Sequence, residues 1–115
     1  VSLSIIDDDV GGRWPAGSNG WVEEALRAQS VPLGPGGSRI VLAFAEPRAS
    51  KGRVGFSAEN RARLAAEGPG ADLVILFGHP RLVAEIPGAA PIIVAWHRQR
   101  LMQEAAARWI AGRTV

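Results

Sequence analysis

The stretch Arg39–Ala45, RIVLAFA, and its counterpart Asp72–Phe77, DLVILF, decide the fold expected for this chain. Each is a nearly continuous apolar run, without the alternation that marks a strand with one face in water. Runs of this kind are typical of parallel strands that helices cover on both faces. Val1–Asp7 and Pro91–Trp96 have the same character. The sequence therefore predicts that these four segments are parallel neighbours in one sheet.

Helical patterns separate the apolar runs. Ser18 or Asn19 stands where a side chain can cap a helix that continues to Ala28. Ser57 is placed to cap a second helix, SAENRARLAAEG, which ends at Gly68.

Two more helices are expected in the second half of the chain. Pro80 suits the first turn of a short helix that continues to Ile86. The last helix is predicted over Gln99–Ala111, and Gly112 ends it. One apolar stripe marks its buried face: Leu101, Met102, Ala105, Ala106, Trp109 and Ile110. Because Trp109 lies on this stripe, as Trp21 does on that of the first helix, we expect both in the core.

Strands that alternate with helices are typical of the α/β class. We expect a three-layer αβα sandwich with an open, mainly parallel sheet of about five strands. Residues 1–115 form a single α/β domain in this interpretation. The segment Ser30–Ser38, SVPLGPGGS, offers the extra strand, followed by a glycine-rich turn.

Composition limits the class of protein. With 115 residues, 47% of them hydrophobic and 21% charged, the chain fits one globular domain. No apolar run approaches the roughly 18 residues of a membrane span, and no leader precedes the first strand, so we expect a soluble protein. Cytoplasmic and exported locations both stay open. Because the chain begins at Val1 without methionine, we expect a processed product or a piece of something longer.

Charge and cysteine content exclude further classes. The formal net charge is +2, and the arginines are dispersed along the chain, so no nucleic-acid surface is predicted. The chain has no cysteine, which excludes disulfides and thiolate chemistry. Two histidines on different loops do not make a metal site, and no cofactor motif is present.

Three consecutive acids, Asp7 to Asp9, follow the first strand. A response-regulator receiver would need an aspartate at the end of the third strand and a lysine after the last one. The comparable strand ends carry Glu46, Gly78 and His79, then His97 and Arg98. The only lysine is Lys51, in a mid-chain loop. We therefore interpret the acids as turn residues that accept bonds from nearby backbone amides, or pair with an arginine of a neighbouring loop or chain.

Three segments carry a resemblance to a known family. They are IIDDDVGGRWP (5–15), LAFAEPRASKGRVGFS (42–57) and DLVILFGHPRLVAEIPGAAPIIVAWHRQRLMQEAAARWIAG (72–112). Together they resemble the C-terminal α/β domain of glycoside hydrolase family 3, in particular bacterial enzymes of the β-N-acetylglucosaminidase and β-glucosidase type. The order and spacing of these segments carry the resemblance, which covers nearly the whole chain.

The resemblance implies a partner and a substrate. Enzymes of this kind carry a (β/α)8 barrel N-terminal to this domain, and the barrel supplies the nucleophilic aspartate and the sugar pocket. In the N-acetylglucosaminidase branch the barrel also supplies an Asp-His acid/base pair. In some β-glucosidase relatives the acid/base is a glutamate of the C-terminal domain, which makes Glu46 a candidate. The implied function is an accessory domain for hydrolysis of β-glycosides, above all β-N-acetylglucosaminides, and the isolated chain is expected to be inactive.

Candidate residues for contact with the sugar or the barrel lie in the loops after the strands. They are Asp8, Asp9, Trp14, Arg48, Lys51, Arg53, His79 and His97. Each has a structural alternative: the charged loop side chains are solvated, Trp14 packs on protein, and His79 bonds to backbone in its turn. The alternative function is a non-enzymatic, flavodoxin- or receiver-like α/β module that binds a ligand or a partner.

Overall fold

Four strands form one parallel sheet in the computed structural model, which describes residues 1–9, 18–45 and 55–113. They are β1 (Ser2–Asp7), β2 (Arg39–Ala45), β3 (Leu73–Gly78) and β4 (Ile92–Val94). Their order in the sheet is β1-β2-β3-β4, and every neighbouring pair is parallel. The prediction of four parallel neighbours is confirmed, and only β4 is notably shorter than its apolar run.

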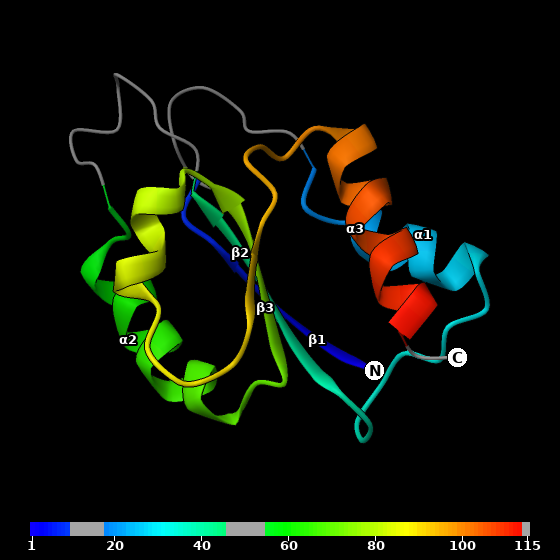
Figure 1. Ribbon diagram of the computed structural model, residues 1–115, viewed down its shortest axis with the longest axis horizontal. Coiled ribbons are helices and arrows are strands. Elements are labelled where there is room, and N and C mark those ends of the chain that lie inside the picture. The colour runs from blue at the N-terminus through cyan, green and yellow to red at the C-terminus, as the bar shows by residue number, and fades with distance from the viewer. Residues whose placement is uncertain (10–17, 46–54, 114–115) are drawn as a thin grey trace.

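Helices connect these strands (Figure 1). α1 covers Trp21–Ala28, α2 covers Ala58–Glu67 and α3 covers Arg100–Arg113. Two short 3-10 helices, η2 (Gly68–Gly70) and η3 (Pro80–Glu85), follow α2 and β3. No helix among the described residues is long and apolar enough to cross a membrane.

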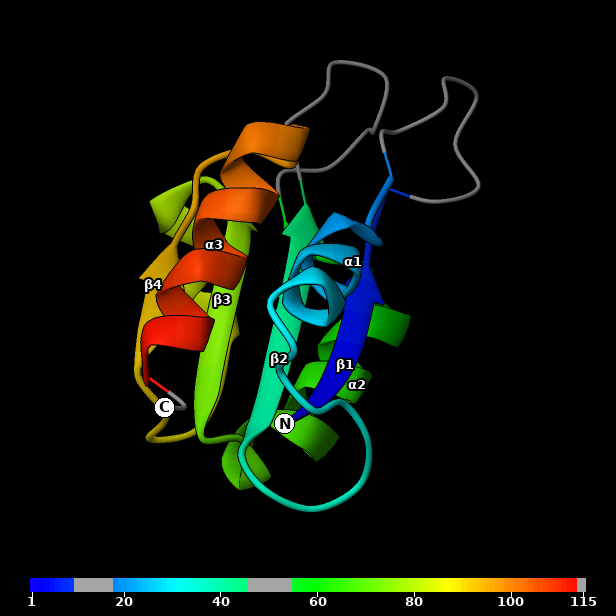
Figure 2. The ribbon, with the colours of Figure 1, turned by 90° about the vertical axis from the view of Figure 1, so that its right-hand side faces the viewer.

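Alternate residues of each strand point to opposite faces of the sheet, and each face has its own apolar cluster. α1 and α3 pack on one face, where the rings of Phe44 and Phe77 stack with centroids 4.5 Å apart. α2 and η3 contribute Leu64 and Leu82 to the cluster on the other face. Figure 2 shows α1 and α3 in front of the sheet and α2 behind it.

The connection from β1 to β2 has an unusual hand. The connection from β1 to β2 and the connection from β2 to β3 run in the same direction across the sheet, but α1 and α2 lie on opposite faces. In Figure 2 the strands point upward, β2 lies to the left of β1, and α1 lies in front of the sheet, so a direct connection from β1 through α1 to β2 would be left-handed. About 98% of such parallel connections are right-handed.

The segment after α1 accounts for this hand. The Val1 nitrogen donates to the Pro32 carbonyl at 2.7 Å, and the Gly34 N–H donates to the Val1 carbonyl at 2.9 Å. This is the hydrogen-bond pattern of a parallel bridge between Val1 and Leu33, on the outer edge of β1. The path from β1 through α1 to this segment is right-handed. The chain then passes round the amino end of β1 to reach β2 (Figure 2). Ser30–Ser38 nevertheless forms no strand of its own.

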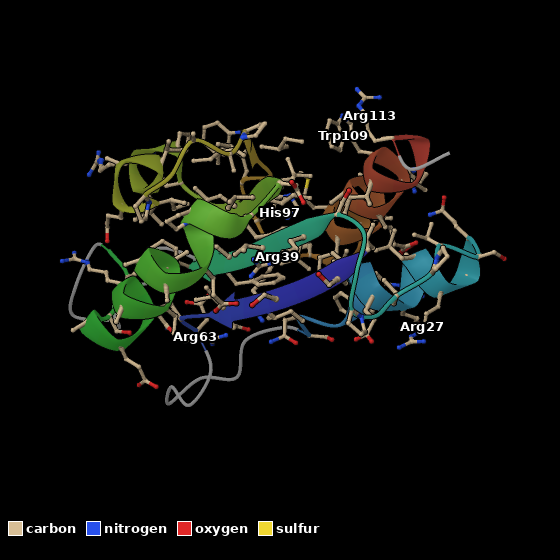
Figure 3. All side chains as sticks on the ribbon, turned by 90° about the horizontal axis from the view of Figure 1, so that it is seen from below. Arg27, Arg39, Arg63, His97, Trp109 and Arg113 are labelled. Atoms are coloured by element: carbon tan, nitrogen blue, oxygen red, sulfur yellow. The ribbon has the colours of Figure 1, made fainter. Side chains whose placement is uncertain are left out.

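The remaining outer edge of β1 is approached from α2. The guanidinium of Arg63 donates to the Ile5 carbonyl at 3.2 Å, and the Ser4 hydroxyl bonds to the Glu67 carboxylate. Figure 3, which views the molecule of Figure 1 from below, shows Arg63 beside β1. The edge therefore carries a charged side chain where a fifth strand would continue.

One of the two predicted helix caps is wrong. Gly20 is the cap residue of α1 and gives it no side-chain bond, whereas Ser18 Oγ accepts the Gly20 N–H at 3.0 Å. The side-chain amide of Asn19 donates instead to Asp7 Oδ2 of the buried carboxylate, at 2.8 Å. The second cap is confirmed, since Ser57 Oγ accepts the Asn60 N–H at 3.2 Å.

The predicted end of α3 and part of its predicted face are also wrong. The helix continues through Gly112 to Arg113. Leu101 is 79% exposed and Trp109 38% exposed, so Trp109 does not lie in the core. Ile110 of the predicted stripe is buried, and Met102 and Ala106 pack against the same core cluster, so only part of the predicted face is wrong. The other buried residues of the helix are Gln103 and Ala107. Trp21 of α1 is half-buried.

Candidate functional site

Polar and aromatic side chains gather at the carboxyl ends of the strands. Asp7 to Asp9 end β1, His79 follows β3, and Trp96 to Arg98 follow β4. Ligands of open α/β sheets bind at this edge. We therefore define the residues Asp7–Asp9, His79 and Trp96–Arg98 as the carboxyl-edge site.

Arg98 is the centre of a buried ionic network. Its Nη2 donates to Asp7 Oδ2 at 2.6 Å and its Nη1 to Asp7 Oδ1 at 2.9 Å. Nη1 also donates to Asp9 Oδ2 at 3.1 Å. The side chains of Arg98 and Asp7 are each 4% exposed and that of Asp9 is 1% exposed. The guanidinium lies 4.9 Å from the ring centroid of Phe44, so the network contacts the apolar core directly.

The network holds Asp7 and Arg98 in their charged forms. Burial alone would raise the pKa of Asp7, but bonds from Arg98, the Asp9 N–H and Asn19 outweigh it and lower that pKa below its usual value. Burial opposes the charge of Arg98, yet its contacts with Asp7 and Asp9 raise its pKa. Asp7 therefore stays ionised at neutral pH and cannot donate a proton as a general acid there.

Asp8 points to a different part of the fold. Its Oδ1 accepts the Ser57 N–H at 3.0 Å and the Asn60 amide at 2.7 Å, at the amino end of α2. A carboxylate in this place is stabilised by the helix dipole. Asp7 Oδ1 accepts the Asp9 N–H at 2.9 Å. The interpretation of the acids as turn residues, with an arginine partner from a neighbouring loop, is confirmed; contact of Asp8 or Asp9 with a substrate stays a prediction.

Gln103 is a site residue that the sequence did not reveal. It is completely buried. Its amide nitrogen donates to the carbonyls of Ser18 at 2.6 Å and Arg98 at 2.7 Å, and its Oε1 accepts the Trp21 N–H at 3.2 Å. One side chain therefore joins the start of α1 to the loop that carries Arg98. These bonds explain how a polar residue is accommodated on the inner face of α3 beside Ala107 and Ile110.

The two histidines have structural roles. His79 Nδ1 accepts the Arg81 N–H at 3.0 Å and caps η3, and His97 Nδ1 accepts the Gln99 N–H at 3.3 Å. The prediction that His79 bonds to backbone is confirmed. His79 is exposed and His97 half-buried. In the part of the chain that the structure describes, no group of three acids or histidines could hold a metal ion.

Trp96 is the most prominent exposed group of the carboxyl-edge site. It is 57% exposed, and its φ of 46° lies in the left-handed region that side chains rarely adopt. The His97 N–H bonds to the Ala95 carbonyl across it, which makes a tight γ-turn. The ring meets His79 edge-on, with centroids 5.9 Å apart and an interplanar angle of 77°. The strained backbone conformation of Trp96 thus accompanies an indole ring that is exposed to solvent.

Five of the predicted site residues lie outside the described ranges. They are Trp14, Glu46, Arg48, Lys51 and Arg53. The roles predicted for them stay predictions.

No family model, curated protein or solved structure matches the chain.

Proposed function

We propose that this chain is the C-terminal accessory domain of a family 3 glycoside hydrolase. In this proposal it packs on a (β/α)8 barrel and helps to complete the sugar site for hydrolysis of β-glycosides, above all β-N-acetylglucosaminides. The support is the resemblance of the three segments described above, together with the state of the carboxyl-edge acids.

The state of those acids is the observation that carries the proposal. A retaining glycosidase needs two carboxyl groups about 5 Å apart, one ionised and one protonated. Asp7 and Asp9 are bound to Arg98, and Asp8 is bound at the start of α2. All three acids therefore stabilise the domain itself. This arrangement suits a scaffold that presents loops to a catalytic domain better than it suits a catalytic centre.

The exposed aromatic pair supports a contact role for the same edge. Trp96 and His79 are exposed, in the segments that follow β4 and β3. Aromatic side chains that are held in the open are frequent anchors of binding surfaces. In the proposed enzyme this pair faces the barrel or the bound sugar.

The proposal extends to the sheet. We propose a three-layer αβα sandwich with a rudimentary fifth strand at Leu33, outside β1. The two hydrogen bonds with Val1 support this, as does the right-handed path that they create. The presence of helices on both faces of the sheet is what such a sandwich requires.

The test is an activity comparison. The purified 115-residue chain should hydrolyse neither an aryl β-glucoside nor an aryl β-N-acetylglucosaminide above background. The reading frame upstream of Val1 should encode a barrel of about 250 residues, and the protein with its barrel should hydrolyse one of the two substrates. Turnover by the isolated chain that Glu46→Gln abolishes would overturn the accessory role.

An upstream sequence without a barrel would instead favour the alternative, a non-enzymatic flavodoxin- or receiver-like module. The exposed indole of Trp96 favours this alternative, because it suits a flat ligand as well as a protein partner.

A further inference from the structure

A pocket lies at the amino ends of the strands, opposite the carboxyl-edge site. It is an open depression of about 210 Å³ between the amino ends of β2 and β3 and the last described turn of α3. Its floor is apolar, because Ile40, Leu73 and Ile110 are core residues that are at most 8% exposed. A cavity of roughly 150 Å³ accommodates a benzene ring. This pocket, which we call the amino-edge pocket, therefore has room for one ring with a small polar substituent.

One wall of the amino-edge pocket already binds a cation. The guanidinium of Arg113 lies 4.4 Å from the ring centroid of Trp109, and both residues line the pocket. Figure 3 shows the two side chains together at the end of α3. The face of an indole ring attracts cations through its negative quadrupole. Arg113 forms no ion pair with any described residue, so the indole is its principal contact within residues 1–9, 18–45 and 55–113.

The rim of the pocket carries a fixed carboxylate. Asp72 Oδ2 accepts the Arg39 N–H at 2.8 Å, and the Asp72 N–H donates to the Arg39 carbonyl at 2.8 Å. The first bond positions the carboxylate and the second fixes the backbone of Asp72 just before β3. Its Oδ1 accepts no hydrogen bond from a described residue. Asp72 and Arg113 line the same pocket, yet they form no ion pair with each other.

We propose that the amino-edge pocket binds an organic cation with a compact apolar body. The ammonium group lies between the Asp72 carboxylate and the indole face of Trp109, and the apolar body covers Ile40, Leu73 and Ile110. Arg113 is then an internal competitor for the indole. An anion is disfavoured, because the carboxylate and the indole face both repel it, and Arg113 is the one cation among the described residues that line the pocket. The proposal concerns the opposite edge of the sheet from the carboxyl-edge site and does not rest on the proposed function.

The cation could be supplied by a free amine or by a lysine side chain of a neighbouring protein, and two probes distinguish these sources. Benzylammonium represents the free amine, and Nα-acetyl-lysine N-methylamide represents the side chain. Benzoate has the same ring with the opposite charge and is the matched control. Each probe is titrated into the 115-residue chain at neutral pH and followed by ¹H–¹⁵N NMR. The Trp109→Phe variant identifies the indole signal of Trp109.

The expected result is saturable shifts at Trp109, Leu73 and Ile110 with one or both cations and none with benzoate. Asp72→Asn keeps the oxygen that accepts the Arg39 N–H but removes the charge, and it should weaken binding about tenfold. Arg113→Ala should tighten binding about threefold, because it removes the competitor from the indole. Arg108→Ala removes an exposed arginine of the same helix outside this pocket and should change nothing.

Three outcomes would overturn the proposal. The first is benzoate binding more tightly than benzylammonium. The second is weaker cation binding in Arg113→Ala. The third is the absence of saturable shifts with both cations in wild type and in Arg113→Ala. The cation that binds more tightly identifies the source.

Discussion

Arg98 grips Asp7 with both of its terminal nitrogens, at 2.6 and 2.9 Å, although 91 residues separate the two in the chain. The pair joins the end of the first strand to the loop before the last helix. Because both side chains are almost completely buried, neither charge has water as an alternative partner. The free energy of unfolding should therefore depend strongly on the integrity of this pair.

Asp7→Asn should lower the free energy of unfolding by about 3 kcal/mol, because it leaves the guanidinium of Arg98 buried with less compensating charge. Urea denaturation monitored by circular dichroism measures the change. Glu23→Gln breaks the exposed pair of Glu23 with Arg27 and should cost at most about 0.5 kcal/mol. Equal losses in the two variants would show that burial of the pair does not determine its contribution.

The same pair predicts a pH dependence. The pKa of Asp7 is lowered in the folded state, so its stabilising contribution is present above the unfolded pKa of about 3.9 and is lost as pH falls through the lower folded value. Wild type should lose more free energy of unfolding between pH 5 and pH 2 than Asp7→Asn does. Urea titrations at both ends of this range give the difference. Parallel pH profiles of the two proteins would contradict the assignment.

Gln103→Leu should lower the free energy of unfolding by about 2 to 3 kcal/mol although it introduces an apolar side chain into a buried position. The Ser18 and Arg98 carbonyls lose their amide donor, and the Trp21 N–H loses its acceptor. Gln99→Leu is the matched control, since Gln99 is exposed just before the same helix, and it should change stability little. A Gln103→Leu protein as stable as wild type would contradict the structural role of these bonds.

Trp96→Gly should be more stable than Trp96→Ala by about 1 kcal/mol, because glycine adopts a φ of 46° without steric cost. Both variants lose the same indole, so the comparison isolates the backbone. At Trp109, inside α3, the order should reverse, since glycine is about 1 kcal/mol worse than alanine in a helix. Thermal and urea denaturation of the four variants measure both differences.

The strands could be predicted from the sequence because their continuous apolar composition indicates that both of their faces are buried. A run such as RIVLAFA has no polar face, so only a sheet covered on both sides can bury it. The cap at Ser57 was likewise predictable, because it depends on residues three positions apart.

The centre of the carboxyl-edge site was only partly predictable, because its bonds join residues far apart in the chain. The acids of β1 suggested an arginine partner, but nothing in the sequence singled out Arg98. Gln103 gave no signal, since a glutamine within a helix is usually solvated. Trp109 is partly exposed despite its place on the apolar stripe, which local periodicity could not reveal. Residues 10–17 and 46–54, which hold five of the predicted site residues, lie outside the described ranges.

The bond from Arg63 to the Ile5 carbonyl has a consequence for handling the protein at high concentration. An outer strand with open backbone groups is a template on which further chains can stack as fibrils. A charged guanidinium on that edge must lose its water before another strand can pair there, which sets a barrier to stacking. Arg63→Ala should therefore increase thioflavin T-positive aggregation on prolonged incubation, whereas Arg27→Ala, an exposed arginine of α1, should not. Arg63 is the residue to retain in any variant of this chain that is prepared for concentrated solution.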